Sequence, residues 1–243
     1  MHKFQKRGVW VPLLLLVGFL HMWVITNYDI GWSRLFRLGT YFIFFLYFIV
    51  QSGWKYGRLL AIFSLFLIRD VSVLFYEIPI AKTIGFLVTI AAYSLITLMV
   101  FKKIKIFVRT SLVFLFVVVI LGLNVFNVLY LSEAIQPGLD NDLQLVLFIL
   151  QGAIMMIMAL AGYLYHDRIR GKLPLVYLYL TLSLVFADLC GLAAYFFEFK
   201  AAFYPERLFY LISLTLLSYY AWIQNSKTVY EWESERLEEQ SLL

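Results

Sequence analysis

The chain has few charged residues and only one cysteine. Asp, Glu, Lys and Arg make up 14% of its 243 residues, while 63% are hydrophobic. Soluble domains contain about 25% charged and about 45–50% apolar residues. A larger hydrophobic core alone would not account for so many apolar residues. We therefore expect lipid to cover most of the surface. Cys190 has no second cysteine to pair with, which excludes an intramolecular disulfide.

Several catalytic signatures are also missing. The histidines His2, His21 and His166 lie far apart, which argues against a multi-histidine metal site. The sequence contains no HExxH, GxSxG or P-loop motif. The last apolar run has no internal lysine for a retinal Schiff base. We therefore expect no metal and no cofactor. Nucleic-acid binding is also not expected, since the basic residues are scattered at the ends of apolar runs.

Long apolar runs are the main feature that the sequence does contain. About 20 residues of helix cross the hydrocarbon core of a bilayer. Runs of suitable length predict helices at residues 9–27, 38–52, 59–76, 83–101, 109–131, 143–165, 173–197 and 208–224. The sequence thus predicts an all-α, polytopic bundle of about eight transmembrane helices over residues 1–225. A short acidic cytoplasmic tail is expected at residues 226–243.

Lys and Arg between the runs predict the orientation. Fourteen of these basic residues fall on the same side of the predicted helices as the two chain ends. The other side has five, namely Arg34, Arg37, Lys82, Lys200 and Arg207. Basic residues mark the cytoplasmic side. We expect a multi-pass protein of the cell membrane with both termini in the cytoplasm, the first apolar run being an uncleaved span.

Two carboxylates interrupt the apolar runs. Asp70 follows Arg69 within SLFLIRDVSVLF, and Asp188 lies within SLVFADLCGLAAYFF. Asp70 is 12 residues past Arg58 and Asp188 is 16 past Lys172. At 1.5 Å per residue these are depths of about 18 and 24 Å. Because acids at membrane depth are costly, they usually face the bundle interior and mark function.

We predict that Asp70 and Asp188 lie close together and share one proton, forming an acid–base pair. The alternative is that each only ties helices together through hydrogen bonds. Other polar residues inside the runs indicate a polar cavity around the two acids. The expected substrate-binding residues are Arg69, Tyr93, Asn124, Gln151, Ser183 and Tyr219.

The segments YGRLLAIFSLFLIRDVSVLF, FLVTIAAY, LVFADLCGLAAYFF and LTLLSYYAW together resemble the bacterial YhhN family, which includes the TMEM86 lysoplasmalogenases. The family motif has Gly where this chain has Arg69, and Ser where it has Ala187. The resemblance implies eight helices and hydrolysis of the vinyl-ether bond of a lysoplasmalogen. Only Asp70 and Asp188 carry over as catalytic residues, with a membrane lipid or lysolipid as the partner.

Two other functions remain open from the sequence. The same acids suit a small-molecule or proton-coupled transporter. A third possibility is a membrane scaffold or sensor whose acidic tail binds a partner.

Overall fold

The computed structural model describes residues 7–52, 56–101, 103–104, 130–132, 134–169 and 171–241, and this part of the chain consists of helices joined by short turns, with no strand. The long helices of this part are α1 (Arg7–Asn27), α2 (Ile30–Ser52), α3 (Gly57–Leu74), α4 (Pro79–Phe101), α6 (Asp142–Arg168), α7 (Lys172–Tyr195) and α8 (Phe203–Ser241). The one-turn helices η2 (Gln136–Gly138) and η3 (Lys200–Ala202) precede α6 and α8.

Local sequence explains several of these boundaries. Pro79 opens α4, a position where its missing N–H costs nothing. Asn141 caps α6, its side chain accepting a hydrogen bond from the Gln144 amide at 3.0 Å. Gly171, with φ of 151°, makes the turn into α7 in a conformation that favours glycine. These signals place the helix starts close to the predicted ones.

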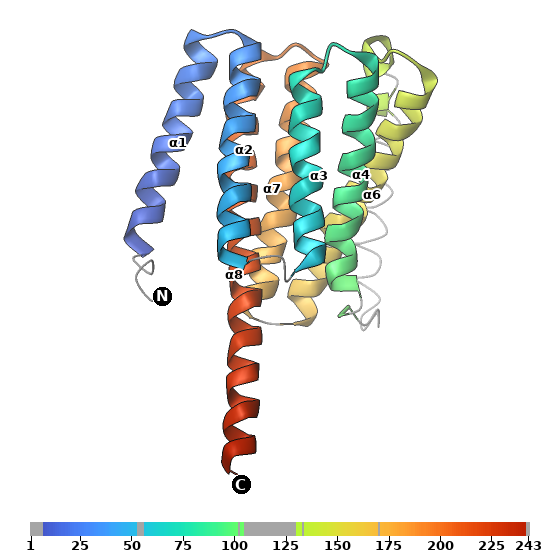
Figure 1. Cartoon of the computed structure of the whole chain (residues 1–243). Coiled ribbons are helices and arrows are strands. Elements are labelled where there is room, and N and C mark those ends of the chain that lie inside the picture. The colour runs from blue at the N-terminus through green and yellow to red at the C-terminus, as the bar shows by residue number, and fades with distance from the viewer. Residues whose placement is uncertain are drawn as a thin grey trace.

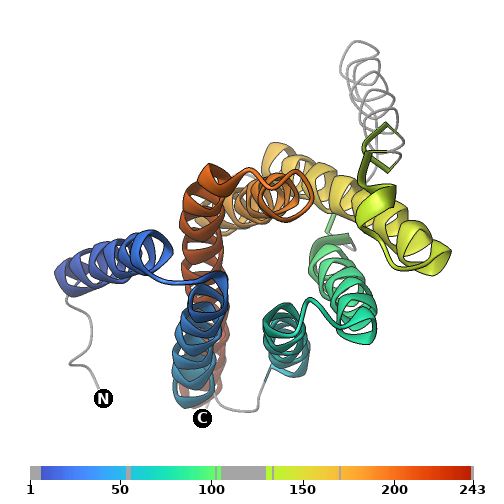
Figure 2. The same cartoon turned by 90° about the horizontal axis from the view of Figure 1, so that it is seen from above.

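Six helices form a closed ring. Contacts connect α2 to α3, α3 to α4, α4 to α6, α6 to α7, α7 to α8, and α8 back to α2. Figure 2 shows this ring from above, with α1 outside it against α2 and α8. The ring positions inward-facing side chains of distant segments around a common centre.

The helices are suited to a bilayer. Four of them, α2 over Ile30–Val50, α4, α6 and α7, are long and apolar enough to cross a membrane. Large apolar side chains such as Phe19, Ile43, Ile80 and Leu98 are exposed on the outer surface. Such extensive apolar exposure indicates contact with lipid. The predicted eight crossings and their orientation stay predictions, and the predicted helix at residues 109–131 lies outside the described residues.

The prediction for the second helix was wrong at its start. The apolar run begins at residue 38, but α2 begins at Ile30 and contains Arg34 and Arg37 as buried residues. Both were expected in an outer loop, as was Arg207, which is buried in the second turn of α8. The physical reason is that carboxylates neutralise each of these arginines, so a helix can carry them inward.

The last helix continues through the acidic tail. α8 runs without a break to Ser241, past the expected boundary at residue 226. Its 39 residues span about 58 Å, against about 30 Å of hydrocarbon. Figure 1 shows it projecting beyond the other helices, at the end of the bundle where α1 begins.

Candidate functional site

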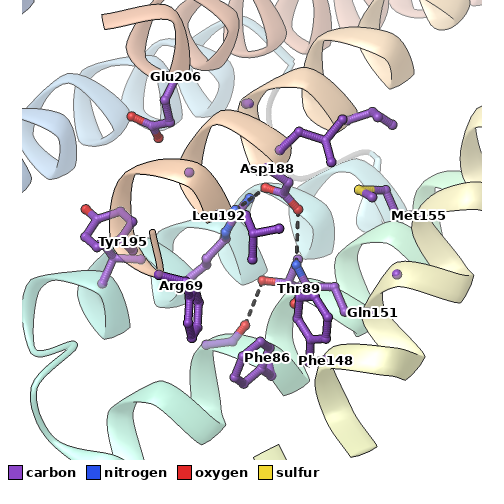
Figure 3. Close-up of a pocket in the computed structure, with 18 of the residues that line it drawn as sticks. Arg69, Phe86, Thr89, Phe148, Gln151, Met155, Asp188, Leu192, Tyr195 and Glu206 are labelled. Carbon is purple, nitrogen blue, oxygen red and sulfur yellow. Dashed lines mark hydrogen bonds and ion pairs between the residues drawn. The ribbon is translucent and has the colours of Figure 1, made fainter. Parts of the chain in front are cut away.

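Asp188 is the centre of a polar cluster that joins four helices. Its carboxylate accepts hydrogen bonds from Arg69 Nη2 at 2.5 Å, Tyr93 Oη at 2.6 Å and Gln151 Nε2 at 3.1 Å. These donors come from α3, α4 and α6, whereas Asp188 belongs to α7. Figure 3 shows Arg69 and Gln151 approaching Asp188 from different sides. The cluster therefore ties together the half of the ring that these helices form.

Asp70 is the centre of a second cluster. Arg37 donates from Nε to Asp70 Oδ1 at 3.0 Å, and the Tyr210 hydroxyl donates to Oδ2. Arg37 also donates from Nη1 to Glu206 Oε1 at 2.7 Å, and Arg207 pairs with the other oxygen of Glu206. This cluster joins α2, α3 and α8, so the two clusters have α3 in common.

The two clusters meet at the peptide that joins Arg69 to Asp70. Together they hold three carboxylates, Asp70, Asp188 and Glu206, and three guanidinium groups, Arg37, Arg69 and Arg207. The opposite charges balance, as buried ions require in a medium of low dielectric constant. All six residues lie within about 10 Å of the end of the bundle where α3 leads to α4 and α7 leads to α8.

The geometry does not give the expected proton-sharing pair of acids. Asp70 and Asp188 each bind their own arginine, and no hydrogen bond or ion pair links them to each other. In both cases the donors include an arginine and a tyrosine, so both carboxylates act as acceptors. Arg69 and Asp70 are adjacent in sequence but about 100° apart around α3, and this separation sends them to different partners.

A cavity of about 610 Å³ lies inside the ring. Its charged lining comes from Arg37, Arg69, Lys82, Asp188 and Glu206, whereas Asp70 is not among the lining residues. The rest of the wall is mainly apolar, with the side chains Phe86, Phe148, Met155 and Leu192 visible in Figure 3. One side of the cavity can thus receive a charged group and the other a hydrocarbon.

Aromatic rings and a lysine close one end of this cavity. Tyr76 packs on Tyr195 with ring centroids 5.2 Å apart, and Lys82 lies 5.2 Å from the centroid of Tyr76. Lys82 also bridges to Asp140 at 2.9 Å and donates to the Gly138 carbonyl at 3.2 Å. These contacts fasten the segment before α6 over the cavity.

Two carboxylates at this end have altered acidity. The hydrogen bond from Lys82 lowers the pKa of Asp140. Desolvation tends to raise the pKa of Glu77, but the hydrogen bond from Arg34, at 2.6 Å, outweighs it and lowers the pKa below 4.5. Burial raises the pKa of Tyr76 above its usual value. Both acids therefore stay ionised at neutral pH as partners of buried cations.

The predicted substrate-binding residues separate into two groups. Arg69, Tyr93 and Gln151 converge on Asp188. Ser183 is buried in α7 but does not line the cavity.

Tyr219 does not line the cavity either, because it lies on the outer face of α8. It is 40% exposed and stacks on Trp222 at 5.7 Å. Asn124 lies outside the described residues.

The sequence did not identify Arg37, Glu206 and Tyr210 as part of the site. One signal was available, because Glu206 and Arg207 form an acid–base pair directly before an apolar run, as Arg69 and Asp70 do within one. Arg37 also follows Arg34 at helical spacing. Neither pattern identifies a partner 169 residues away, which is the separation between Arg37 and Glu206.

No metal site emerges from the described part of the chain, where no three His, Cys, Asp or Glu residues are grouped to hold an ion. Comparisons of the chain with protein-family models, curated proteins and solved structures found no match. The resemblance to the YhhN family stays a prediction, and the function is inferred below from the site alone.

Proposed function

We propose that the cavity binds a single-chain lysolipid and that the protein is a membrane hydrolase of ether lysolipids. The observation that carries this proposal is the two-sided cavity, in which Arg37, Arg69, Asp188 and Glu206 face a mainly apolar wall. Its volume of about 610 Å³ falls within the range of about 300–1,000 Å³ for small-molecule sites. A lysolipid has the matching form, a polar head on one hydrocarbon chain.

Asp188 is the acid best placed to act on such a ligand. It lines the cavity, and donors from three helices fix its orientation. Hydrolysis of a vinyl ether first transfers a proton from solvent to the vinyl carbon, and water then attacks the resulting oxocarbenium ion. A carboxylate at Asp188 can stabilise that cation and accept the proton that the attacking water loses. The hemiacetal formed in this way breaks its C–O bond to give the aldehyde and the free alcohol.

Asp70 has a different role in this proposal. It does not line the cavity, but its carboxylate holds Arg37, which does. We therefore assign Asp70 as a positioning residue that aims Arg37 toward the headgroup. This assignment replaces the symmetric pair of catalytic acids expected from the sequence.

Turnover of a lysoplasmalogen by the purified protein tests the hydrolase. The assay follows release of the aldehyde by wild type, Asp188→Asn and Asp70→Asn. We expect Asp188→Asn to lose about 10²–10⁴-fold in rate, the usual contribution of an acid–base group. Asp70→Asn should weaken substrate binding more than the rate. Equal turnover by all three proteins would overturn the proposal.

A second candidate function is proton-coupled transport. Three buried carboxylates paired with arginines at the centre of a helix ring support it, because intramembrane ion pairs commonly mark transport pathways. Proteoliposomes distinguish the two functions. A transporter gives substrate-dependent proton flux with no product, whereas a hydrolase gives product with no flux.

A further inference from the structure

The cavity continues as a cleft between α6 and α7. On α6 the lining residues Phe148, Gln151, Met155, Ala159 and Tyr163 recur every three or four positions, so they form one stripe along the helix. On α7 the lining residues Leu182, Val185, Leu189 and Leu192 form a similar stripe. The two stripes face the same space and carry no charge, and apart from the Gln151 amide and the Tyr163 hydroxyl their side chains are apolar.

This cleft opens on the outer surface of the bundle. Tyr163, Leu182 and Leu189 line the cavity and are also 44%, 36% and 41% exposed. A residue that lines an internal cavity and is exposed as well lies at an opening. Because the outer surface faces lipid, the opening leads sideways into the membrane rather than to water.

Close helix packing bounds the cleft. Gly162 lies so near Thr181 that a Cβ on the glycine would collide with the threonine side chain. The helices touch at this point, so the space between the stripes is confined to one side of the contact. The cleft therefore has a defined course along α6, from Gln151 beside the polar cluster to Tyr163.

The length of this course matches a lipid chain. Gln151 and Tyr163 are 12 residues apart, which corresponds to about 18 Å of helix. One leaflet of a bilayer has about 15 Å of hydrocarbon, half of the full thickness. A single alkyl chain of membrane length can thus extend from the polar cluster to the level of Tyr163.

We infer that the cleft between α6 and α7 holds the alkyl chain of the lysolipid, which enters sideways from the membrane, and that Ala159 and Tyr163 set the chain length accepted. This inference rests on the proposed function and names the part of the site that selects the substrate. Ala159 is the smallest of the α6 residues in the stripe, so a larger side chain there would shorten the cleft.

Tryptophan substitution tests the inference. Ala159→Trp places a large ring in the cleft, whereas Ile157→Trp is a control on the same helix, because Ile157 is 50% exposed and does not line the cavity. A second pair lies on α7, where Leu182 and Leu175 are both 36% exposed but only Leu182 lines the cavity. Each variant is reconstituted in nanodiscs, and its affinity for lauroyl and stearoyl lysophosphatidylcholine is measured.

We expect Ala159→Trp and Leu182→Trp to weaken stearoyl binding by about tenfold or more relative to lauroyl binding, the scale on which apolar pockets discriminate size. Ile157→Trp and Leu175→Trp should leave the ratio unchanged. If either cleft variant fails to fold, the pair on the other helix decides. Binding by wild type with the same chain-length ratio in all variants overturns this inference alone. No binding of either lipid by wild type removes the proposed function and the inference with it.

Discussion

Arg69 of α3 and Asp188 of α7 lie on opposite sides of the helix ring, and their side chains meet at 2.5 Å across its centre. They are 119 residues apart in the sequence. The contact explains why an arginine can stand inside an apolar helix, since its charge is neutralised by an acid from another segment. It also brings α3 and α7, the helices that carry the predicted acids, to one site.

Removal of one partner of this ion pair should lower the free energy of unfolding more than removal of both partners. Arg69→Leu leaves the buried Asp188 with only Tyr93 and Gln151 as donors, and we expect a loss of about 3–5 kcal/mol in unfolding free energy. Arg69→Leu combined with Asp188→Leu should lose less than Arg69→Leu alone. Unfolding in mixed detergent micelles measures both, and simple additivity of the single effects would contradict the ion pair.

Two glutamates, one buried and one exposed, each pair with a buried arginine and so offer a matched comparison. Glu206 and Glu77 each accept from an arginine, at 2.7 and 2.6 Å, but their side chains are 3% and 69% exposed. Glu206→Gln leaves the buried Arg37 and Arg207 without a full countercharge, so we expect a loss of several kcal/mol. Glu77→Gln should cost less, because water reaches the Glu77 end of its pair and the buried Arg34 keeps its cation–π contacts with Tyr76 and Tyr195. Similar melting temperatures for the two variants would contradict this account.

The Glu77 pair also predicts a small pH dependence. The pKa of Glu77 in the folded protein lies below 4.5, so the unfolded chain binds the proton more tightly. The pair therefore contributes fully above pH 4.5 and loses its contribution as the pH falls through the folded-state value. A melting series between neutral and acid pH should fall less steeply in Glu77→Gln than in wild type. Identical slopes would show that the pair has no effect.

The contact of Gly162 with Thr181 predicts an unusual cost for a small substitution. Gly162→Ala should destabilise the protein by about 1–3 kcal/mol, because the added methyl group overpacks the contact of α6 with α7. Gly39→Ala is the control, since Gly39 is also helical but has nothing within 4 Å of its missing Cβ. That change should be neutral or stabilise by about 0.5–1 kcal/mol through helix propensity. The reverse order of the two melting temperatures would contradict the close packing.

The sequence predicted most helices of the described chain and the levels of both acids, because apolar length and helical rise depend only on local composition. Arg69, Tyr93 and Gln151 were expected in a polar cavity around the two acids, but periodicity did not show that all three donate to Asp188. The partner of Asp70 could not be anticipated. Arg37 lies before the apolar run that was used to start the second helix, so it was assigned to a loop.

A single sequence also does not show which side chains pair across the ring. Helical periodicity gives the face on which a residue lies, but not the helix that this face meets. Tyr219 illustrates the limit, because it lies close in sequence to the fully buried Tyr220 and yet points outward. Tyr210, two turns into α8, points inward and donates to Asp70.

The central claim is that Asp188 and its donors form a lysolipid site inside the ring. Ligand-dependent stabilisation tests it most directly, measured as the shift in melting temperature of wild type, Asp188→Asn and Glu77→Gln in nanodiscs with a lysoplasmalogen. At a ligand concentration of 100 times Kd, binding stabilises the folded state by about 2.7 kcal/mol. We predict this shift in wild type and in Glu77→Gln, and its loss in Asp188→Asn. A shift of equal size in all three proteins, or no shift in wild type, would contradict the account.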